Sequence, residues 1–564
     1  MAETSTESSR KLTHFQPEVT YSPEKKGPQT LELIADPTTG EIVKSGDPQD
    51  VRLWIEAERS RAETLGQKPV DLEKIHGGLL LPGMIDAHAH PFIYSGLDIA
   101  NPVSLENTDT KEELIGELRK AAAEREPGTF VVGTNYKTTH IKDLTKNDLD
   151  AVSPDHKVVV YDPSYHGCYV NSRALHEVED FARKYQRLAK TRLRGDATRD
   201  GHLTEDWVFM TWELIEQEGG VEKLTDLTEK TLDTYLSQGI TGVRDIELGT
   251  FTEVMAYLML KKKQGPNFRV RQMYLQPRSL NYVESQVHQL EELGFSLDDV
   301  RGSLTGFKLY SDGSVGTHTA LMHEPYIDEH GGRGQVFYRM DQLNKALRMA
   351  RERGLENIGI HAIGDRGIQR AVQLAQTWVR MGEKEGFDPT KFSIEHFSLP
   401  SPQKKTLQDV KDLGIWVCEQ PNFLSDYKYE DRLGKRVTLV CPHREILNYD
   451  IPMMFGADGM PTSALFGIWM ATHALEETQR LSFDEALLAY SLASGMYEGK
   501  NVGSLQEGQE ANIVVADPKL LGSLLSSEII DPREGIAVES TRKALEANIR
   551  KLMFRGQFVS PKAA

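Results

Sequence analysis

The feature that most constrains this chain is a series of metal-ligand side chains, each placed at the end of a short apolar run. Parallel strands of a closed sheet deliver the residues at their carboxyl ends to one common face, so ligands placed there converge. Two histidines separated by one residue share a strand face and can chelate one ion. In chain order the series is His88 and His90 in MIDAHAH, Lys308 in GFKLYSDGS, His361 in IGIHAIGD, His396 in FSIEHFS and Asp458 in MFGADGMP.

Taken singly, each of these signals has an ordinary structural explanation. Histidines at strand ends are more often hydrogen-bonding residues than ligands. A lysine after an apolar strand is usually a surface residue that extends its ammonium into solvent. Six such residues in this order, every one at a strand end, are hard to assemble by chance. We therefore predict one metal site built from all six.

Strand-like and amphipathic helix-like segments alternate through the middle of the chain. This alternation indicates an α/β fold with a parallel sheet. Because the ligands come from both ends of the run of strands, the sheet must close, which predicts a TIM-like (β/α)8 barrel over residues 81–499. The expected strands are VVVYDPS, ITGVRDI, FRVRQMYL, LTGFKLYSDG, NIGIHAIGD, FSIEHFS, IWVCEQP and IPMMFGADG.

The spacing of the ligands predicts an insertion in the first half of the barrel. From Lys308 to Asp458 the ligands arrive about every 30 to 60 residues, in keeping with one or two βα units each. More than 200 residues separate His90 from Lys308, which is more than three such units need. We expect an α/β insertion over the barrel mouth at about residues 105–230.

Composition limits the functions open to the chain. With 84 acidic and 66 basic residues the formal net charge is −18, which argues against binding to nucleic acid or to an anionic membrane. Cys168, Cys418 and Cys441 are too few and too far apart for a disulfide framework, and we interpret them as buried thiols. No run is long and apolar enough to span a membrane, and the first 26 residues are polar. The expected location is the cytoplasm.

Longer stretches around and beyond the ligands form a recognisable set. They are GGLLLPGMIDAHAHP, GFKLYSDGSVGTHTA, IGIHAIGDRGI, FSIEHFSLP, EQPNF, FGADGMPTS and GSLQEGQEANIVVAD. This set resembles the amidohydrolase superfamily of metal-dependent hydrolases, and within it the YtcJ-like branch, amidohydrolase family 3, which includes N-substituted formamide deformylases. The resemblance extends from about residue 77 to about residue 556.

The resemblance implies a small β-sandwich domain, formed from both chain ends, beside the barrel. Its candidate strands are a hairpin in TLELIADPTTGEIVKSG and further strands in ANIVVAD and IRKLMFRGQFVS. We assign residues 28–80 and 500–564 to this domain. The polar start of the chain, residues 1–27, is expected to be a flexible arm.

The ligand types suit zinc, which binds imidazole and carboxylate and lowers the pKa of a bound water toward neutrality. A free ammonium has no lone pair and cannot ligate. In the superfamily, a lysine at the place of Lys308 reacts with carbon dioxide to give a carbamate that bridges two metal ions. The resemblance therefore implies two zinc ions per chain, the first held by His88, His90 and Asp458, the second by His361 and His396, with carboxylated Lys308 between them.

The resemblance also implies an activity and further site residues. Asp458 would be catalytic, taking a proton from the attacking water and passing it to the leaving nitrogen. Candidate substrate-binding residues are His166 in YHGCYVNS, and Asp312 and His318 in the loop after Lys308. The implied reaction is cleavage of the carbon–nitrogen bond of a small N-acyl, N-formyl or cyclic amide by metal-activated hydroxide.

Three other interpretations make different demands on the sequence. A mononuclear deaminase of a heterocyclic amine would not need a carboxylated lysine, and Lys308 speaks against it. A catalytically inactive scaffold with the same fold would be free to lose ligands, yet every ligand position is filled. The excess of acidic over basic residues argues against a nucleic-acid-binding protein. The expected partner is a small amide substrate, with no nucleic acid and no membrane, and a homodimer is the default assembly.

Overall fold

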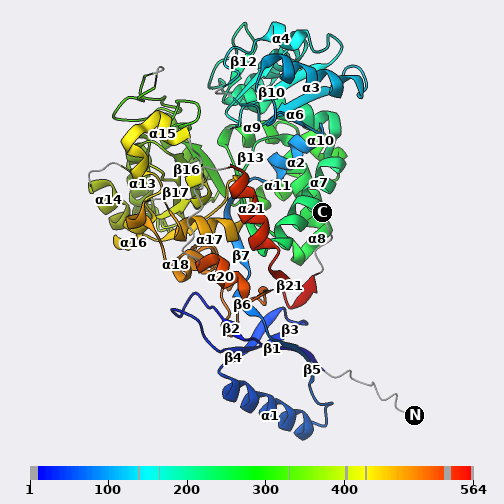
Figure 1. Cartoon of the computed structure of the whole chain (residues 1–564), viewed down its shortest axis with the longest axis vertical. Coiled ribbons are helices and arrows are strands. Elements are labelled where there is room, and N and C mark those ends of the chain that lie inside the picture. Colours follow the sequence, from blue (N-terminus) through cyan, green and yellow to red (C-terminus); the bar gives the residue numbers. More distant parts are fainter. Residues whose placement is uncertain are drawn as a thin grey trace.

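The computed structural model of the protein describes residues 10–137, 140–163, 165–328, 331–400, 404–425, 428–474, 476–525 and 535–559. These residues form four β-sheets and the helices that cover them. An eight-stranded sheet lies in the middle of the molecule. In the view of Figure 1, a five-stranded inserted sheet lies at the top and two sheets from the chain ends lie toward the bottom.

The central sheet consists of parallel strands in the order β19-β18-β17-β16-β15-β14-β13-β7. Nearly all of their residues are buried, as expected for parallel strands that are covered on both faces. The strands are β7 (Met84–Ala89), β13 (Ile240–Leu248), β14 (Val270–Leu275), β15 (Gly306–Tyr310), β16 (Asn357–Ala362), β17 (Phe392–His396), β18 (Trp416–Glu419) and β19 (Met453–Phe455).

The sheet closes on itself where the chain leaving β19 meets β7. The backbone N–H of Asp458 donates to the carbonyl of His88 at 2.9 Å, and the N–H of Ala457 donates to the carboxylate of Asp86 at 3.0 Å. Gly456 lies so close to β7 that an added Cβ would stand 2.3 Å from the backbone nitrogen of His88. The predicted TIM-like barrel is confirmed, and its closure brings the ligand-bearing ends of β7 and β19 side by side.

Helices cover the outside of the barrel because each presents an apolar stripe to it. In α13 (Asp365–Glu385), Ile368, Ala371, Ala375 and Trp378 are buried at three- and four-residue spacing. The other helices among the barrel strands are α8 (Phe251–Gln264), α9 (Pro277–Glu284), α10 (Val287–Glu292), α11 (Leu297–Ser303), α12 (Met340–Glu352), α14 (Lys405–Leu413), α15 (Lys428–Leu433), α16 (His443–Asn448), α17 (Ala464–Thr472), α18 (Phe483–Ala489) and α19 (Leu492–Glu498).

Between β7 and β13 the chain forms the inserted sheet, in the order β12-β11-β10-β9-β8. It overlaps the insertion expected at about residues 105–230. VVVYDPS, which was expected among the barrel strands, forms β10 of this sheet instead, paired with β9 and β11. The elements are α2 (Pro91–Asp98), β8 (Val103–Ser104), α3 (Lys111–Ala123), β9 (Phe130–Thr134), α4 (Lys146–Asp150), β10 (Lys157–Tyr161), β11 (Gly167–Val170), α5 (Ser172–Ala189), β12 (His202–Thr204), α6 (Asp206–Gly219) and α7 (Val221–Ser237).

The two remaining sheets combine strands from both chain ends, in the orders β4-β3-β1-β5 and β2-β6-β20-β21-β22. Phe15, Leu33, Ile513 and Met553 pack together in the core that the two sheets share. The elements are β1 (Lys11–Gln16), β2 (Val19–Thr20), β3 (Glu32–Asp36), β4 (Glu41–Gly46), α1 (Pro48–Thr64), β5 (Asp71–His76), β6 (Leu79–Pro82), β20 (Ile513–Ala516), α20 (Lys519–Leu525), α21 (Gly535–Glu546), β21 (Ile549–Phe554) and β22 (Gln557–Val559).

The start of the chain differs from the flexible arm expected over residues 1–27. Lys11–Gln16 is a strand that pairs antiparallel with β3 and parallel with β5. Leu12 packs toward α1, and Phe15 packs into the core between the sheets. The packing of Leu12 and Phe15, together with hydrogen-bonded strands on both sides, orders this polar segment. Residues 1–9 lie outside the described part of the chain.

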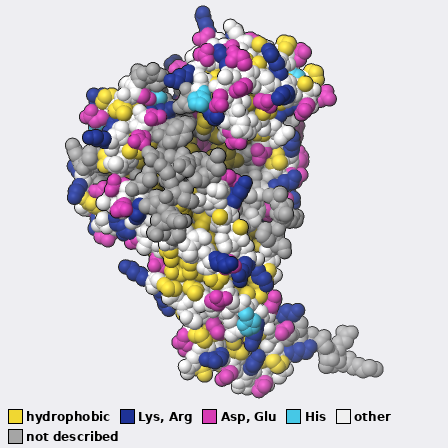
Figure 2. Space-filling view, viewed as in Figure 1, with side chains coloured by type: hydrophobic (Ala, Val, Ile, Leu, Met, Phe, Trp, Pro, Cys, Tyr) yellow, Lys and Arg dark blue, Asp and Glu magenta, His cyan; other side chains and the backbone are white. Residues whose placement is uncertain are grey.

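The surface carries charges of both signs. On the face shown in Figure 2, acidic and basic side chains are interspersed, with no continuous basic area among the side chains described there. No helix in the described ranges combines the length and the apolar character that crossing a lipid bilayer requires.

Gly456→Ala should destabilise the fold, because its methyl group would collide with β7 at the barrel closure. We expect a loss of about 1–3 kcal/mol of unfolding free energy, typical of overpacking, measured by urea denaturation. Gly116→Ala is the matched control: Gly116 lies in α3 with nothing within 4 Å of an added Cβ, and alanine favours a helix. Equal stability of the two variants would contradict a tight closure at Gly456.

Candidate metal centre

The six residues of the ligand series all lie at the end of the barrel to which the strands' carboxyl ends point, and they come from five strands. Four lie within strands, and two lie in the segment that follows a strand. His90 is the residue before α2, so it stands just past the strand rather than in it. The positions are His88 in β7, Lys308 in β15, His361 in β16, His396 at the end of β17, and His90 and Asp458 just after β7 and β19.

The carboxylate of Asp458 stands among three of the histidines. Its Oδ1 lies 3.2 Å from Nε2 of His90 and 3.8 Å from Nε2 of His88, and its Oδ2 lies 3.9 Å from Nδ1 of His396. The ring centroids of His361 and His396 are 4.3 Å apart. The fold therefore gathers four imidazoles and one carboxylate into a single cluster.

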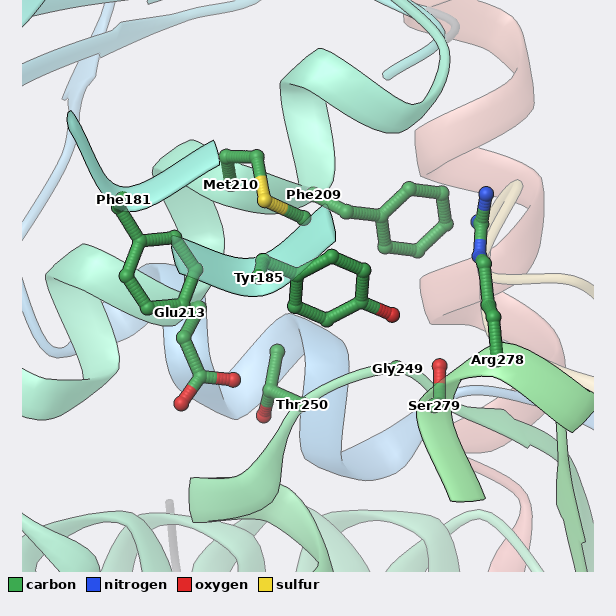
Figure 3. Close-up of a pocket in the computed structure, with 9 residues that line it drawn as sticks. All are labelled: Phe181, Tyr185, Phe209, Met210, Glu213, Gly249, Thr250, Arg278 and Ser279. Atoms are coloured by element: carbon green, nitrogen blue, oxygen red, sulfur yellow. The ribbon is translucent and has the colours of Figure 1, made fainter. Parts of the chain in front are cut away.

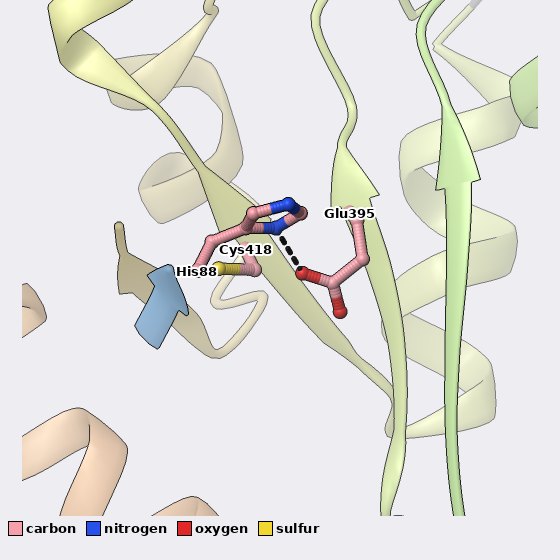
Figure 4. Close-up of side chains that lie close together, drawn as sticks. All are labelled: His88, Glu395 and Cys418. Carbon is pink, nitrogen blue, oxygen red and sulfur yellow. Dashed lines mark hydrogen bonds and ion pairs between the residues drawn. The ribbon is translucent and has the colours of Figure 1, made fainter. Parts of the chain in front are cut away.

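A buried carboxylate orients His88. Nδ1 of His88 donates to Oε2 of Glu395 at 2.8 Å, with Cys418 beside the pair (Figure 4). Donation from Nδ1 leaves a lone pair on Nε2, which is buried and has no hydrogen-bond partner among the described residues. An imidazole held through one nitrogen and open at the other is the usual arrangement of a metal ligand.

His361 and His396 are held in the same way. Nε2 of His361 donates to the carbonyl of Gly313 at 3.1 Å, and Nδ1 of His396 donates to Oε1 of Gln420 at 2.7 Å. Burial, and then the neighbouring histidine and Lys308, lower the pKa of both rings well below the ordinary value. The neutral imidazole, which is the form that binds a metal, is thereby favoured.

Lys308 is a buried lysine, with a relative exposure of 1%. This burial rules out the ordinary explanation of a surface side chain. Burial lowers the pKa of its ammonium, although Glu395, Glu247 and Asp458 act in the opposite direction. A lowered pKa favours the neutral amine, whose lone pair can attack carbon dioxide, whereas the ammonium has none.

Sequence reasoning missed the ion pair between Arg244 and Glu395 that supports His88. The Nη2 of Arg244 lies 2.8 Å from Oε1 of Glu395, and both side chains are buried. Burial alone would raise the pKa of Glu395, but Arg244 and then Lys308 outweigh it and hold that pKa below the ordinary value. Glu395 therefore remains a carboxylate that accepts from His88. The available signal was a charged residue inside each of two apolar strands, FSIEHFS and ITGVRDI.

His166 reaches the cluster from the inserted sheet. It lies between β10 and β11, and its ring centroid is 6.2 Å from that of His361. Its Nδ1 lies 3.0 Å from Oε2 of Glu205. Burial lowers the pKa of His166, but Glu205 outweighs burial and raises that pKa above the ordinary value. The inserted sheet thus places a hydrogen-bond donor beside the histidine cluster.

Asp312 does not have the substrate-binding position expected of it. It is fully buried, and its carboxylate accepts the backbone N–H groups of Leu321, Ile363 and Gly364 at 2.7, 3.1 and 2.9 Å. These bonds join the loop after β15 to the loop after β16. We therefore assign Asp312 a structural role, because its oxygens are already used by the backbone.

His318 lies in the loop that follows β15, in the left-handed region with a φ of 58°. Its Nε2 lies 2.5 Å from Oδ2 of Asp328, and its ring packs edge-on against Tyr326 at 4.9 Å between centroids. Both contacts are to residues of the same loop. A role of His318 toward a substrate stays a prediction.

A separate small pocket lies between α5, α6 and α9 (Figure 3). Its cavity of about 10 Å³ has room for about one water molecule. None of the six ligands lines it, so this pocket is not the substrate site. The lining residues are Phe181, Tyr185, Phe209, Met210, Glu213, Gly249, Thr250, Arg278 and Ser279.

Comparison with known proteins agrees with the barrel. The sequence model described as "Amidohydrolase family" matches residues 70–559, which is most of the chain. The protein therefore belongs to the amidohydrolase family, and it is an enzyme of the class that hydrolyses carbon–nitrogen bonds.

Individual relatives are distant but nearly full-length. The chain is 23% identical over 532 residues to the putative amidohydrolase YtcJ of Bacillus subtilis, covering 89% of this chain and 92% of that one. It is 23% identical over 518 residues to the N-substituted formamide deformylase of Arthrobacter pascens, covering 81% and 87%. An uncharacterized metal-dependent hydrolase from Pyrococcus horikoshii has the same fold, with a TM-score of 0.66, 22% identity and coverage of 93% and 98%.

Arg244→Met should destabilise the protein by about 3–5 kcal/mol near neutral pH, because it leaves Glu395 buried without its cation. In the wild type the lowered pKa of Glu395 gives stability above the unfolded pKa of about 4.3, which is lost as the pH falls through the folded pKa. In the variant, the largest influence that opposes burial is lost, so the pKa of Glu395 should rise above its wild-type value, and protonation relieves the penalty. The stability difference, measured by urea denaturation, should therefore shrink in acid.

The control is Lys411→Met, which breaks an exposed ion pair with Asp450 of 2.9 Å. This change should cost at most about 1 kcal/mol, with little dependence on pH. If Arg244→Met were as mild as the control, the ion pair would not be what keeps Glu395 charged.

Proposed function

We propose that the protein is a binuclear zinc hydrolase that cleaves the carbon–nitrogen bond of a small N-acyl, N-formyl or cyclic amide. The observation that supports this most strongly is the cluster at the barrel mouth. Three of its imidazoles are each held through one nitrogen, and the carboxylate of Asp458 lies within 4 Å of a ring nitrogen of His88, His90 and His396. The likeness to N-substituted formamide deformylase supports the N-formyl member of this substrate class.

The donors of the cluster fit zinc, which prefers neutral imidazole and carboxylate. When bound, such ions polarise a substrate carbonyl and lower the pKa of a water molecule toward neutrality. Lys308 would join the two ions as a carbamate, for which its buried amine is suited. The residues that would hold the ions are His88, His90 and Asp458 for the first and His361 and His396 for the second, with Lys308 between them.

Asp458 is suited to move the proton. Its side chain is 18% exposed, against 1% for His88, so it lies on the open side of the cluster. Its two oxygens contact three histidines, and a carboxylate so placed can accept a proton from water and return it to the leaving nitrogen. We assign it the role of general base and then general acid.

The inserted sheet is proposed as a lid over the metal centre. His166, held by Glu205, faces His361 from this sheet, and its raised pKa favours the cationic ring. A cationic imidazole donates hydrogen bonds, so His166 would bind an oxygen of the substrate acyl group. The fold then supplies the reacting groups from the barrel and the positioning group from the insertion.

Asp458→Asn should separate proton transfer from metal binding. Asparagine keeps the size and one oxygen ligand but cannot carry the proton, so kcat should fall by about 10²–10⁴-fold or more. Metal content, measured by mass spectrometry, should change little. Asp341→Asn, at the start of the surface helix α12, is the control. A kcat of Asp458→Asn within about tenfold of wild type would contradict the role of Asp458 as the base.

Lys308→Ala should abolish turnover and lower metal content, because the proposed bridge between the ions is lost. A short carboxylic acid added in solution should restore part of both by replacing the carbamate oxygens. The measurements are metal analysis and release of amine or acid from a panel of formamides, N-acyl amines and cyclic amides. Near-normal turnover of Lys308→Ala would contradict the bridge and favour a mononuclear centre instead.

A further inference from the structure

A second group of metal-binding side chains lies on the other side of the barrel wall, between β18 and α16. It consists of Glu419, Cys441 and His443, whose ligand atoms all lie within 4.8 Å of one another. Glu419 ends β18, and side chains alternate along a strand, so it faces away from Cys418 and Gln420. Those two contact the histidine cluster. The second group is therefore separate from the six-residue centre.

The carboxylate of Glu419 and the ring nitrogens of His443 are buried without a hydrogen-bond partner among the described residues, whereas the thiol of Cys441 lies 3.9 Å from the carbonyl of Gln420. Glu419 and His443 are fully buried, and Cys441 is 1% exposed. A carboxyl and an imidazole buried in this way carry a large desolvation cost. A cation bound between them would offset that cost.

The spacing of the donors fits a metal ion better than a direct contact. Nε2 of His443 lies 3.6 Å from Oε2 of Glu419, which is too long for a hydrogen bond. Nitrogen and oxygen ligands of tetrahedral zinc, each bonded at about 2.0–2.2 Å, lie about 3.4 Å apart. Cys441 adds a soft sulfur donor, which selects zinc over magnesium or calcium.

We propose that Glu419, Cys441 and His443 bind a structural zinc ion, with water completing a tetrahedral set of ligands. The site is closed to substrate because all three side chains are buried. It goes beyond the proposed hydrolysis, since none of its residues belongs to the reacting cluster.

The ion would stabilise the loop that supports the metal centre. The backbone N–H of Cys441 donates to the carbonyl of Ser398, just after β17, at 2.9 Å. Glu419 directly precedes Gln420, whose amide oxygen holds His396. Binding of one ion to Glu419 and Cys441 would fix the ends of β17 and β18 relative to each other. These three ligands are therefore positioning residues for His396, not catalytic ones.

The test uses the full-length protein, stripped of metal by a chelator and reloaded with Co²⁺ alone. A thiolate bound to Co²⁺ gives a near-ultraviolet charge-transfer band, and the six-residue centre contains no cysteine. Wild type should show this band. Cys441→Ser should lose it and bind about one ion fewer per chain. Cys418→Ser, the matched control, should keep both the band and the ion count.

A band that is absent from the wild type, or that survives in Cys441→Ser, would overturn the proposal. Loss of the band in Cys418→Ser alone would place the ion beside His88 and would overturn it equally. Glu419→Gln, nearly identical in shape, gives a second readout if Cys441→Ser does not fold: it should lose the band and bind about one ion fewer.

The proposal of a structural zinc site and the proposal of amide hydrolysis can be contradicted separately. His361→Ala changes the six-residue centre, so it should lower the ion count and the activity but leave the thiolate band in place. If no amide in the panel is hydrolysed while the band behaves as expected, the substrate proposal fails and the structural site stands.

Discussion

The metal centre depends on the hydrogen bonds that close the barrel between β19 and β7. Asp458 donates its backbone N–H to the carbonyl of His88, so the residue that supplies the carboxylate is tied directly to the strand that supplies the first histidines. Gly456 permits this approach because it has no side chain. The first and last ligands of the series are 370 positions apart in the sequence, and this closure brings them into contact. A barrel that did not close here would separate the first ligands from the last.

A second requirement is charge balance in a buried place. Burial lowers the pKa of Lys308, His88, His361 and His396 and so favours their neutral forms, which are the forms suited to carbamate formation and metal binding. The same burial would protonate Glu395, but Arg244 keeps it charged and able to orient His88. The ion pair between Arg244 and Glu395 thus keeps one carboxylate charged next to metal ligands that are neutral. Removing either partner would change the protonation of the site as well as its shape.

The sequence predicted the barrel and the convergence of its ligands because both follow from position on a strand. A ligand at the end of a parallel strand is directed by topology, whatever its neighbours are. VVVYDPS was misplaced because its apolar run is equally compatible with either sheet, and only its partners β9 and β11 decide. The arm was misjudged because Lys11–Gln16 is polar and gains order from contacts with distant segments.

The errors within the site have the same origin. Asp312 follows Lys308 closely, but its direction is set by backbone N–H groups of the next loop, which no local pattern reveals. Glu395 adjoins the ligand His396 in the sequence, yet its role depends on Arg244, which lies 151 positions away. Side chains at strand ends were predictable, whereas the contacts that orient them come from elements far apart in the chain.

The measurement that tests the central claim most directly is anomalous scattering at the zinc edge from crystals of the full-length protein. The account predicts two peaks at the barrel mouth, one among His88, His90 and Asp458 and one beside His361 and His396, with density for a carbamate on Lys308. Diffraction data from zinc-loaded crystals that show well-ordered side chains at these residues and no anomalous peak among them would contradict it.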